Sequence, residues 1–202
     1  VEDDDPRPGP GEVRVRVLAA GVSFTDAQLR AGTYLGVPKP PFTPGYELVG
    51  VVEELGPGCS RLRAGDRVAA LTVWGAYAER VCVPEVEAVE VPDELDPAEV
   101  VSLVLPYMTA YQLLHRTARV KSGETVLVHG AAGGVGLFAA QLARHRGARV
   151  LGTAMPGDHD LLRELDVEPF DFREDVEGWV RAQAPDGVDA VLDAVGAPPV
   201  LD

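Results

Sequence analysis

The sequence predicts an α/β fold in two parts, a β-rich amino-terminal domain followed by a parallel, doubly wound sheet. Short apolar runs separated by glycine and proline turns fill residues 10–95, which is typical of a small barrel or a partly open β-domain. From residue 125 onward, strand patterns alternate with helix patterns, which indicates a parallel sheet with crossover helices. We therefore expect a first domain over residues 1–112 and a second over residues 113–202.

The elements of the first domain follow from alternation and turn residues. Residues 12–17 alternate charged with apolar side chains, as a half-buried strand does, and residues 23–34 are expected to form a short helix or a turn. The segment 38–47, "PKPPFTPGYE", carries too many prolines for regular structure. Further strands are expected within residues 48–56, 67–71 and 76–84.

The second domain is preceded by a helical stretch, residues 97–118, with a break expected at Pro106. The strands expected after it are residues 125–130, 148–154, 168–172 and 187–196. The helices expected between them are residues 131–147, 158–165 and 175–184.

Charge and cysteine content limit the possible function classes. The chain has 18 basic and 32 acidic residues, a net charge of −14, which argues against nucleic acid or an anionic membrane as the main partner. Cys59 and Cys82 are too few and too far apart for a disulfide framework or a thiolate metal site. We see no signal peptide and no run of about 18 apolar residues, so we expect a cytoplasmic protein that is not inserted in a membrane.

The stretch "HGAAGGVG", residues 129–136, lies between a predicted strand and a predicted helix. It matches G-x-G-x-x-G with Ala131, Gly133 and Gly136 in the three glycine slots. The amides of such a turn bind the pyrophosphate of a dinucleotide at the helix N-terminus. The expected binding set is Ala131, Ala132, Gly133, Gly134, Val135 and Gly136. A dinucleotide-binding sheet usually has about six strands, so we expect its second half to be missing from these 202 residues.

The end of the second parallel strand indicates which cofactor binds. NAD sites place an acid there to bond the ribose 2′-hydroxyl, whereas this chain has Thr153 and Ala154. The absence of an acid favours NADPH. The cation for its 2′-phosphate is expected to be His159, with Arg163 or Arg173 as alternatives.

The order of the segments "AAGVSFTD", "PGYELVGVVEELG", "GDRV", "YMTAY" and "VLVHGAAGGVGLFAAQLA" resembles the medium-chain dehydrogenase/reductase superfamily, and most of all its zinc-free quinone oxidoreductase branch. The resemblance implies a GroES-like β-domain and a Rossmann-type dinucleotide-binding domain. Zinc-dependent relatives have Cys and His ligands where this chain has Ser23 and Tyr46, which are poor zinc ligands. We therefore expect no metal site, and we expect Glu47 to be a structural acceptor.

The resemblance also implies roles for individual residues. Ser23 lies where the branch has a residue near the nicotinamide, and Tyr34 matches a tyrosine of the same region. Thr109 matches a threonine that contacts the cofactor, His159 stands at a lysine position near the 2′-phosphate, and Phe172 stands at a tyrosine position near the adenosine. The catalytic candidates are Tyr34, Ser23 and Tyr46. Tyr34 either donates a proton to the substrate or only lines the site.

These observations predict an NADPH-dependent enzyme that delivers hydride to a small electrophile, either a quinone or an α,β-unsaturated carbonyl, without zinc. One alternative is an enoyl reductase that acts on acyl thioesters. Another is a nucleotide-sensing or interaction protein without turnover. We expect a homodimer if the second half of the dinucleotide-binding sheet is present.

Overall fold

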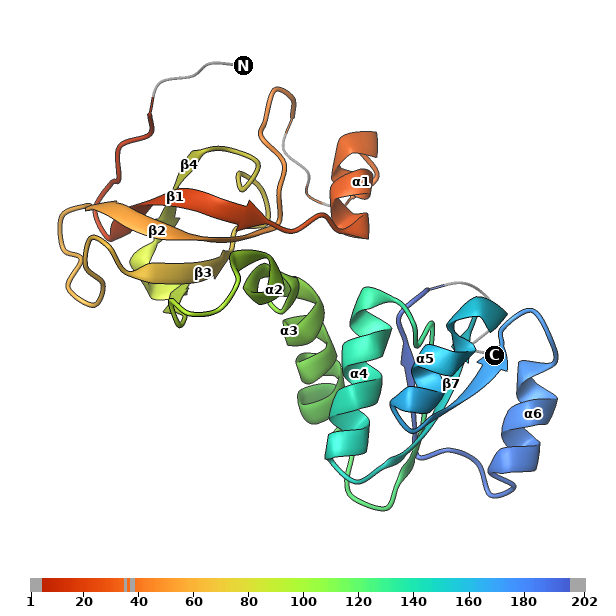
Figure 1. The fold of residues 1–202 in the computed structure, drawn as a ribbon. Helices are drawn as coiled ribbons and strands as arrows, with labels where there is room; N and C mark the ends of the chain where they lie inside the picture. The colour runs from red at the N-terminus through yellow and green to blue at the C-terminus, as the bar shows by residue number, and fades with distance from the viewer. Residues whose placement is uncertain (1–4, 35, 37–38, 197–202) are drawn as a thin grey trace. The chain divides into compact units, whose positions relative to one another are not determined.

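The computed structural model describes residues 5–34, 36 and 39–196. It divides the chain into two compact units, Val1–Leu105 and Pro106–Asp202. In Figure 1 the colour runs from red to green through the first unit and from green to blue through the second. The boundary that we expected after residue 112 lies within the second of these units.

The first unit is built on an antiparallel sheet with strand order β4-β1-β2-β3-β5. Its strands are β1 (Glu12–Ala20), β2 (Glu47–Leu55), β3 (Arg67–Leu71), β4 (Arg80–Pro84) and β5 (Ala88–Glu90). Two short helices accompany the sheet, α1 (Phe24–Ala31) and α2 (Pro97–Ser102), with a 3₁₀ turn over Glu85–Glu87. The β-domain predicted from the turn spacing is thus confirmed.

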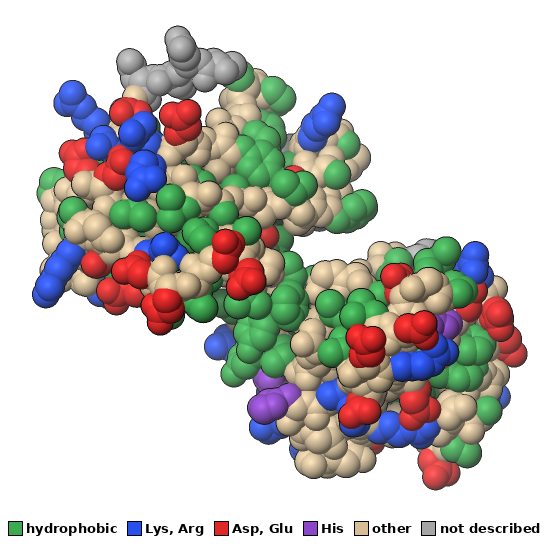
Figure 2. Space-filling view, viewed as in Figure 1, with side chains coloured by type: hydrophobic (Ala, Val, Ile, Leu, Met, Phe, Trp, Pro, Cys, Tyr) green, Lys and Arg blue, Asp and Glu red, His purple; other side chains and the backbone are tan. Residues whose placement is uncertain are grey.

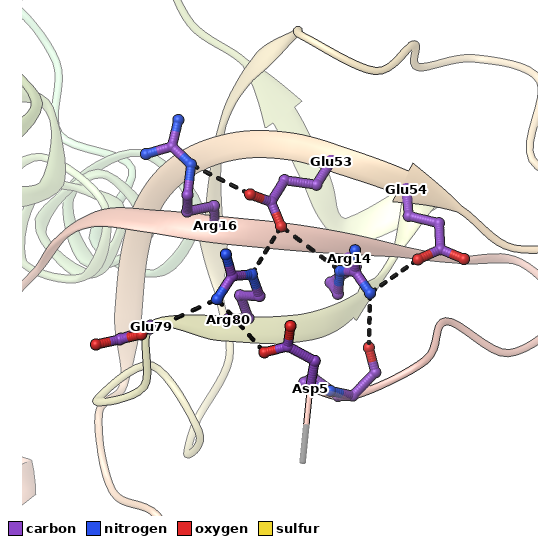
Figure 3. A network of polar contacts seen from close by, with 8 residues as sticks. Asp5, Arg14, Arg16, Glu53, Glu54, Glu79 and Arg80 are labelled. Carbon is purple, nitrogen blue, oxygen red and sulfur yellow. Dashed lines mark hydrogen bonds and ion pairs between the residues drawn. The ribbon is translucent and has the colours of Figure 1, made fainter. Parts of the chain in front are cut away.

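The alternation in β1 separates an apolar face from a charged face. Val13 and Val15 are fully buried in the core beside Leu48. Arg14 and Arg16 alternate with these valines and point the other way, where they meet acidic residues of β2 (Figure 3). Arg14 lies 2.8 Å from Glu54 in a pair of which only Glu54 is well exposed.

Glu53 is the centre of this charged network (Figure 3). Its carboxylate accepts a 2.9 Å bond from Arg80 of β4 and lies 3.2 Å from Arg16 of β1. The network therefore links three neighbouring strands on the solvent side. On the face drawn in Figure 2, acidic and basic side chains are interspersed in the same way over both units.

The second unit is built on a parallel sheet with strand order β8-β7-β6-β9, as the alternation of patterns predicts. Its strands are β6 (Thr125–His129), β7 (Arg149–Ala154), β8 (Val167–Asp171) and β9 (Ala190–Asp193). The helices between them are α4 (Gly134–His145), α5 (His159–Glu164) and α6 (Val176–Gln183), with a 3₁₀ turn over Pro156–Asp158. The strand order reverses at β6, and ligands of such sheets bind at the carboxyl ends of the strands beside that reversal.

Helix α4 packs closely on this sheet because its inner face is made of small residues. Ala139, Ala140 and Ala143 are all buried, and they join Val126 and Val150 in one apolar cluster. This packing fixes the start of α4 against the end of β6, where the glycine-rich turn lies.

The helical stretch 97–118 differs in one detail from the expectation. It breaks at Leu103–Val104, between α2 and α3 (Leu105–Tyr111), rather than at Pro106. Pro106 lies in the first turn of α3, where its missing N–H has no partner to lose. The remaining residues, Gln112–Ala118, form a π-helical segment.

Candidate functional site

The turn between β6 and α4 is sharp because Gly130 adopts a left-handed backbone, with φ of 74°. The amide of Gly133 closes the turn on the carbonyl oxygen of Gly130 at 3.0 Å. The motif assigns the tight turn to its first slot, Ala131, but the left-handed residue is the preceding one. Gly130 is therefore a site residue that the motif did not predict. A glycine directly after a predicted strand is the sequence feature that could have identified it.

The glycines of the turn have two different environments. Gly133 and Gly134 are exposed, and a Cβ on Gly133 would meet only the Gly130 carbonyl oxygen, at 3.3 Å. Gly136 is buried, and a Cβ there would overlap the same oxygen and lie 2.9 Å from the Cα of Ala131. Gly133 thus leaves open space outside the protein, whereas Gly136 is required by packing inside it.

The open side of the turn fits a pyrophosphate group. Gly134, Val135 and Gly136 form the first turn of α4, and N–H groups at this place have no acceptor within the helix. They carry the positive end of the helix dipole, which stabilises anions. Ala132 and Val135 are half-buried at the sides of the turn. The residues present therefore suit the dinucleotide that the motif predicts.

A buried hydrogen-bond chain holds the turn to the neighbouring strand. The Thr153 hydroxyl accepts a bond from the Gly130 amide at 3.2 Å and lies 2.6 Å from Nδ1 of His129. The Ala131 amide donates to the Thr153 carbonyl oxygen at 2.9 Å. Thr153 and Ala154 are both buried, so Thr153 acts on the turn itself. His129 is a second residue that the motif did not single out.

The ends of β7 and β8 offer two cations near one acid. Asp171, the last residue of β8, is held by Arg173 through a pair of contacts at 2.9 and 2.5 Å. Arg173 lowers the pKa of Asp171 to about 2, with a smaller contribution from the charge of His159. The Nε2 atom of His159 is buried and has no hydrogen-bond partner among the described residues.

Arg163, one alternative to His159, lies elsewhere. It forms an ion pair with Asp160 at 2.7 Å and lines a hollow of about 480 Å³ with Arg144 and Arg149. This hollow is at the amino ends of β7 and β8, opposite the glycine turn. Of the candidate cations, His159 and Arg173 therefore remain at the end of the sheet where the turn lies.

Two further predicted cofactor residues are placed at the edges of the turn. Phe172 is 44% exposed, and its ring stands edge-on to His129 with 6.4 Å between centroids. Thr109 is half-buried on α3, one turn after Pro106. A Cβ on Gly134 would lie 3.8 Å from the Pro106 ring, so α3 lies beside the start of α4.

In the first unit, the structure brings two of the three catalytic candidates together. The Tyr34 and Tyr46 hydroxyl oxygens are 3.2 Å apart, and the rings meet edge to face with 6.3 Å between centroids. The hydrogen bond to Tyr34, followed by burial, raises the pKa of Tyr46 to about 12. Ser23 is engaged differently, because its hydroxyl and its amide both donate to Asp26 at 2.8 Å.

Glu47 follows Tyr46 and is the buried structural acceptor that we expected. Its carboxylate accepts a 2.5 Å bond from the amide of Leu105, and its Cδ would lie 2.7 Å from a Cβ on Gly21. Burial raises the pKa of Glu47. Nearby, the Tyr77 hydroxyl donates to the Gly21 carbonyl oxygen at 3.0 Å, and burial is the main cause that raises the pKa of Tyr77 to about 12.

The described residues include neither a metal-binding cluster nor a helix that could span a membrane. Within residues 5–34, 36 and 39–196, no group of three or more His, Cys, Asp or Glu side chains is arranged to hold a metal ion. In the same part of the chain, every helix is too short or too polar to cross a bilayer.

Comparison with known proteins matches both units to families. Residues 9–93 match the alcohol dehydrogenase GroES-like domain, and residues 134–202 match the family described as zinc-binding dehydrogenase. Among curated proteins, the human synaptic vesicle membrane protein VAT-1 homolog is 40% identical over 95% of this chain and 49% of its own length. Human quinone oxidoreductase is 41% identical over 84% of this chain and 52% of its own length.

Solved structures of two reductases are also similar to this chain. The quinone oxidoreductase from Thermus thermophilus, also solved in complex with NADPH, has a TM-score of 0.83 and 39% identity over 98% of this chain and 62% of that one. A 2-haloacrylate reductase has a TM-score of 0.84 and 38% identity over 96% of this chain and 60% of that one. The chain spans about half the length of the curated relatives it matches. On these matches, this chain belongs to the medium-chain dehydrogenase/reductase superfamily, in its quinone oxidoreductase-like branch.

Proposed function

We propose that the protein is an NADPH-dependent reductase that transfers hydride to a quinone or an α,β-unsaturated carbonyl without using zinc. The observation that carries the proposal is the exposed turn at Gly133 and Gly134, which leaves room for a pyrophosphate beside the free amides of α4. The names of the reductases that this chain resembles support the same reaction class.

The preference for NADPH rests on the carboxyl ends of β7 and β8. The buried Ala154 ends β7, so no carboxylate there bonds a ribose 2′-hydroxyl or repels a 2′-phosphate. His159 and Arg173 are the cations beside this end of the sheet, and both interact with Asp171. A 2′-phosphate would compete with Asp171 for them.

The nicotinamide supplies the hydride when the cofactor is bound, and the protein must then manage the negative charge that collects on the substrate oxygen. We assign Tyr34 as the proton donor for that oxygen. Its phenol O–H is a hydrogen-bond donor that can deliver a proton. Ser23 bonds to Asp26, so we assign it the role of holding the start of α1.

The absence of zinc from the mechanism rests on the chemistry of two side chains. Where zinc-dependent relatives have cysteine and histidine ligands, this chain has the Ser23 hydroxyl and the Tyr46 phenol. Neither competes with thiolate and imidazole for zinc. In their hydrogen bonds Ser23 is paired with Asp26, and Tyr46 with Tyr34.

Turnover by the Tyr34→Phe variant tests the proposal. We expect its kcat with a quinone or an enone to fall about 10²–10⁴-fold, the usual effect of a positioned general acid, while its affinity for NADPH stays unchanged. The matched control is Tyr77→Phe, which removes a hydrogen-bonded phenol of the same unit. A wild-type protein that binds NADPH but reduces neither acceptor would exclude the proposal, and an acyl thioester with a conjugated double bond tests the alternative substrate.

A cytoplasmic location is a further part of this proposal, and so is a homodimeric state of the protein that includes the second half of the dinucleotide-binding sheet. Cell fractionation tests the first. Size-exclusion chromatography with light scattering tests the second, and a monomer at micromolar concentration would contradict it.

A further inference from the structure

The two tyrosines of the phenol pair are held by very different parts of the first unit. Tyr46 directly precedes β2, and its carbonyl oxygen accepts bonds from the amides of Thr72 at 2.8 Å and Val73 at 3.2 Å. Tyr34 follows the end of α1, two residues after Gly32, whose backbone is left-handed. Tyr46 is therefore fixed to the sheet, whereas Tyr34 stands on a loop.

We propose that Tyr46 is a positioning residue that donates its hydroxyl hydrogen to the oxygen of Tyr34 and so directs the Tyr34 proton toward the substrate. This inference rests on the proposed function, because it assumes that Tyr34 is the proton donor. It adds to that function the group that orients the donor and stabilises it after the transfer.

Either hydroxyl of the pair could donate at this distance, and the proposal assigns the donor role to Tyr46. The two hydroxyl oxygens, 3.2 Å apart, have room for one hydrogen bond between them. If Tyr46 donates, the hydrogen of Tyr34 is left for another acceptor, and donation polarises the O–H bond of Tyr34. The raised pKa of Tyr46, caused first by its bond to Tyr34, agrees with Tyr46 as the partner that keeps its proton.

The proton transfer can be written with all charges balanced. A bound NADPH would supply a hydride to the electron-poor carbon of the substrate, and the electron pair of the conjugated system would then collect on the carbonyl oxygen. The O–H bond of Tyr34 then breaks, and its proton binds to that oxygen. Tyr34 is left as a phenolate that accepts the bond from Tyr46, until water returns a proton. This scheme favours substrates whose charge collects on oxygen, which are quinones and enones.

The kinetic test compares Tyr34→Phe, Tyr46→Phe and the double variant with the wild-type protein. A hydrogen bond to a charged oxygen is worth a factor of about 10–100, so we expect kcat of Tyr46→Phe to fall by that factor with an unchanged KM for NADPH. Because Tyr46 acts through Tyr34, the double variant should be no slower than Tyr34→Phe alone. The control, Tyr77→Phe, should stay near the wild-type rate.

Two kinetic results would overturn the inference. One is wild-type turnover in Tyr46→Phe. The other is a double variant slower than Tyr34→Phe by the full Tyr46 factor, because Tyr46 would then act independently.

A second measurement needs no turnover and separates this inference from the proposed function. In protein labelled with ¹³C at the tyrosine Cζ, the Tyr34 resonance should shift in Tyr46→Phe and stay in place in Tyr77→Phe. A shift without any reductase activity in the wild-type protein would leave the pair intact and refute the proposed function. An unmoved Tyr34 resonance would refute the pair itself.

Discussion

Replacing Gly133 and Gly136 separately by alanine should distinguish cofactor binding from folding. The backbone of Gly133 is extended, with φ of −75° and ψ of 166°, which any residue adopts. The new Cβ would meet one oxygen at 3.3 Å, so a shift of a few tenths of an ångström relieves it. We therefore expect Gly133→Ala to change the free energy of unfolding by no more than about 0.5 kcal/mol.

Gly136→Ala should behave in the opposite way. Its Cβ would overlap the Gly130 carbonyl oxygen and lie 2.8 Å from the carbonyl carbon, and both atoms belong to the backbone. Forcing backbone apart costs about 1–3 kcal/mol. For a unit of about 100 residues, each kcal/mol lowers Tm by about 4–8 °C, so we expect a loss of about 4–24 °C.

Thermal unfolding without cofactor and calorimetric titration with NADPH measure the two effects. Gly133→Ala should keep the wild-type Tm and lose about 10- to 100-fold in NADPH affinity, the value of one hydrogen bond to a charged group. Wild-type affinity in Gly133→Ala would show that no phosphate approaches this glycine. Wild-type Tm in Gly136→Ala would refute the tight packing of the turn.

Three further outcomes are expected. His159→Ala should lower the ratio of NADPH to NADH affinity, because the His159 ring lies at the end of the sheet where the 2′-phosphate is expected; an unchanged ratio would assign the 2′-phosphate to Arg173. Asp171→Asn should lower Tm at neutral pH, because Asp171 stabilises the fold only while it is ionised. Since the folded pKa of about 2 lies below the ordinary 3.8, the difference from wild type should shrink as pH falls from 3.8 and vanish below 2. A difference that is as large at pH 2 as at neutral pH would contradict this. Elemental analysis of purified protein should find no stoichiometric zinc, as expected for Ser23 and Tyr46, and one zinc ion per chain would contradict the zinc-free mechanism.

The sequence was sufficient for the parallel sheet because each of its strands is followed by a glycine turn or a helix pattern. Periodicity and turn residues are local properties, and β6 to β9 all lie within the expected ranges or one residue from them. Gly130 was missed because a motif records which residue is present and not its backbone angle. The break at Leu103–Val104 was missed because proline is favourable in the first turn of a helix and not only at its end.

The pairing of side chains across the site could not be obtained in the same way. Tyr34 and Tyr46 are separated by a proline-rich segment without periodicity, so nothing local fixes the distance between their hydroxyls. Thr153 was named from its place at the end of a strand, which does not reveal its partners inside the protein. Its hydroxyl bonds with His129 and with the Gly130 amide, and both partners lie at the end of the neighbouring strand.

The hydrogen bonds of the glycine turn also determine how its amides exchange with solvent. The amides of Gly130 and Ala131 are bonded to Thr153, and that of Gly133 to Gly130, so these protons are protected in the protein alone. The next three amides, at the start of α4, have no acceptor in the helix, and we expect the exposed one, of Gly134, to exchange fast until an anion binds. The protected amides would serve as an internal reference, and the exchanging amide would report anion binding. Deuterium uptake over eight consecutive residues, 129–136, would therefore measure occupancy of the site without any substrate.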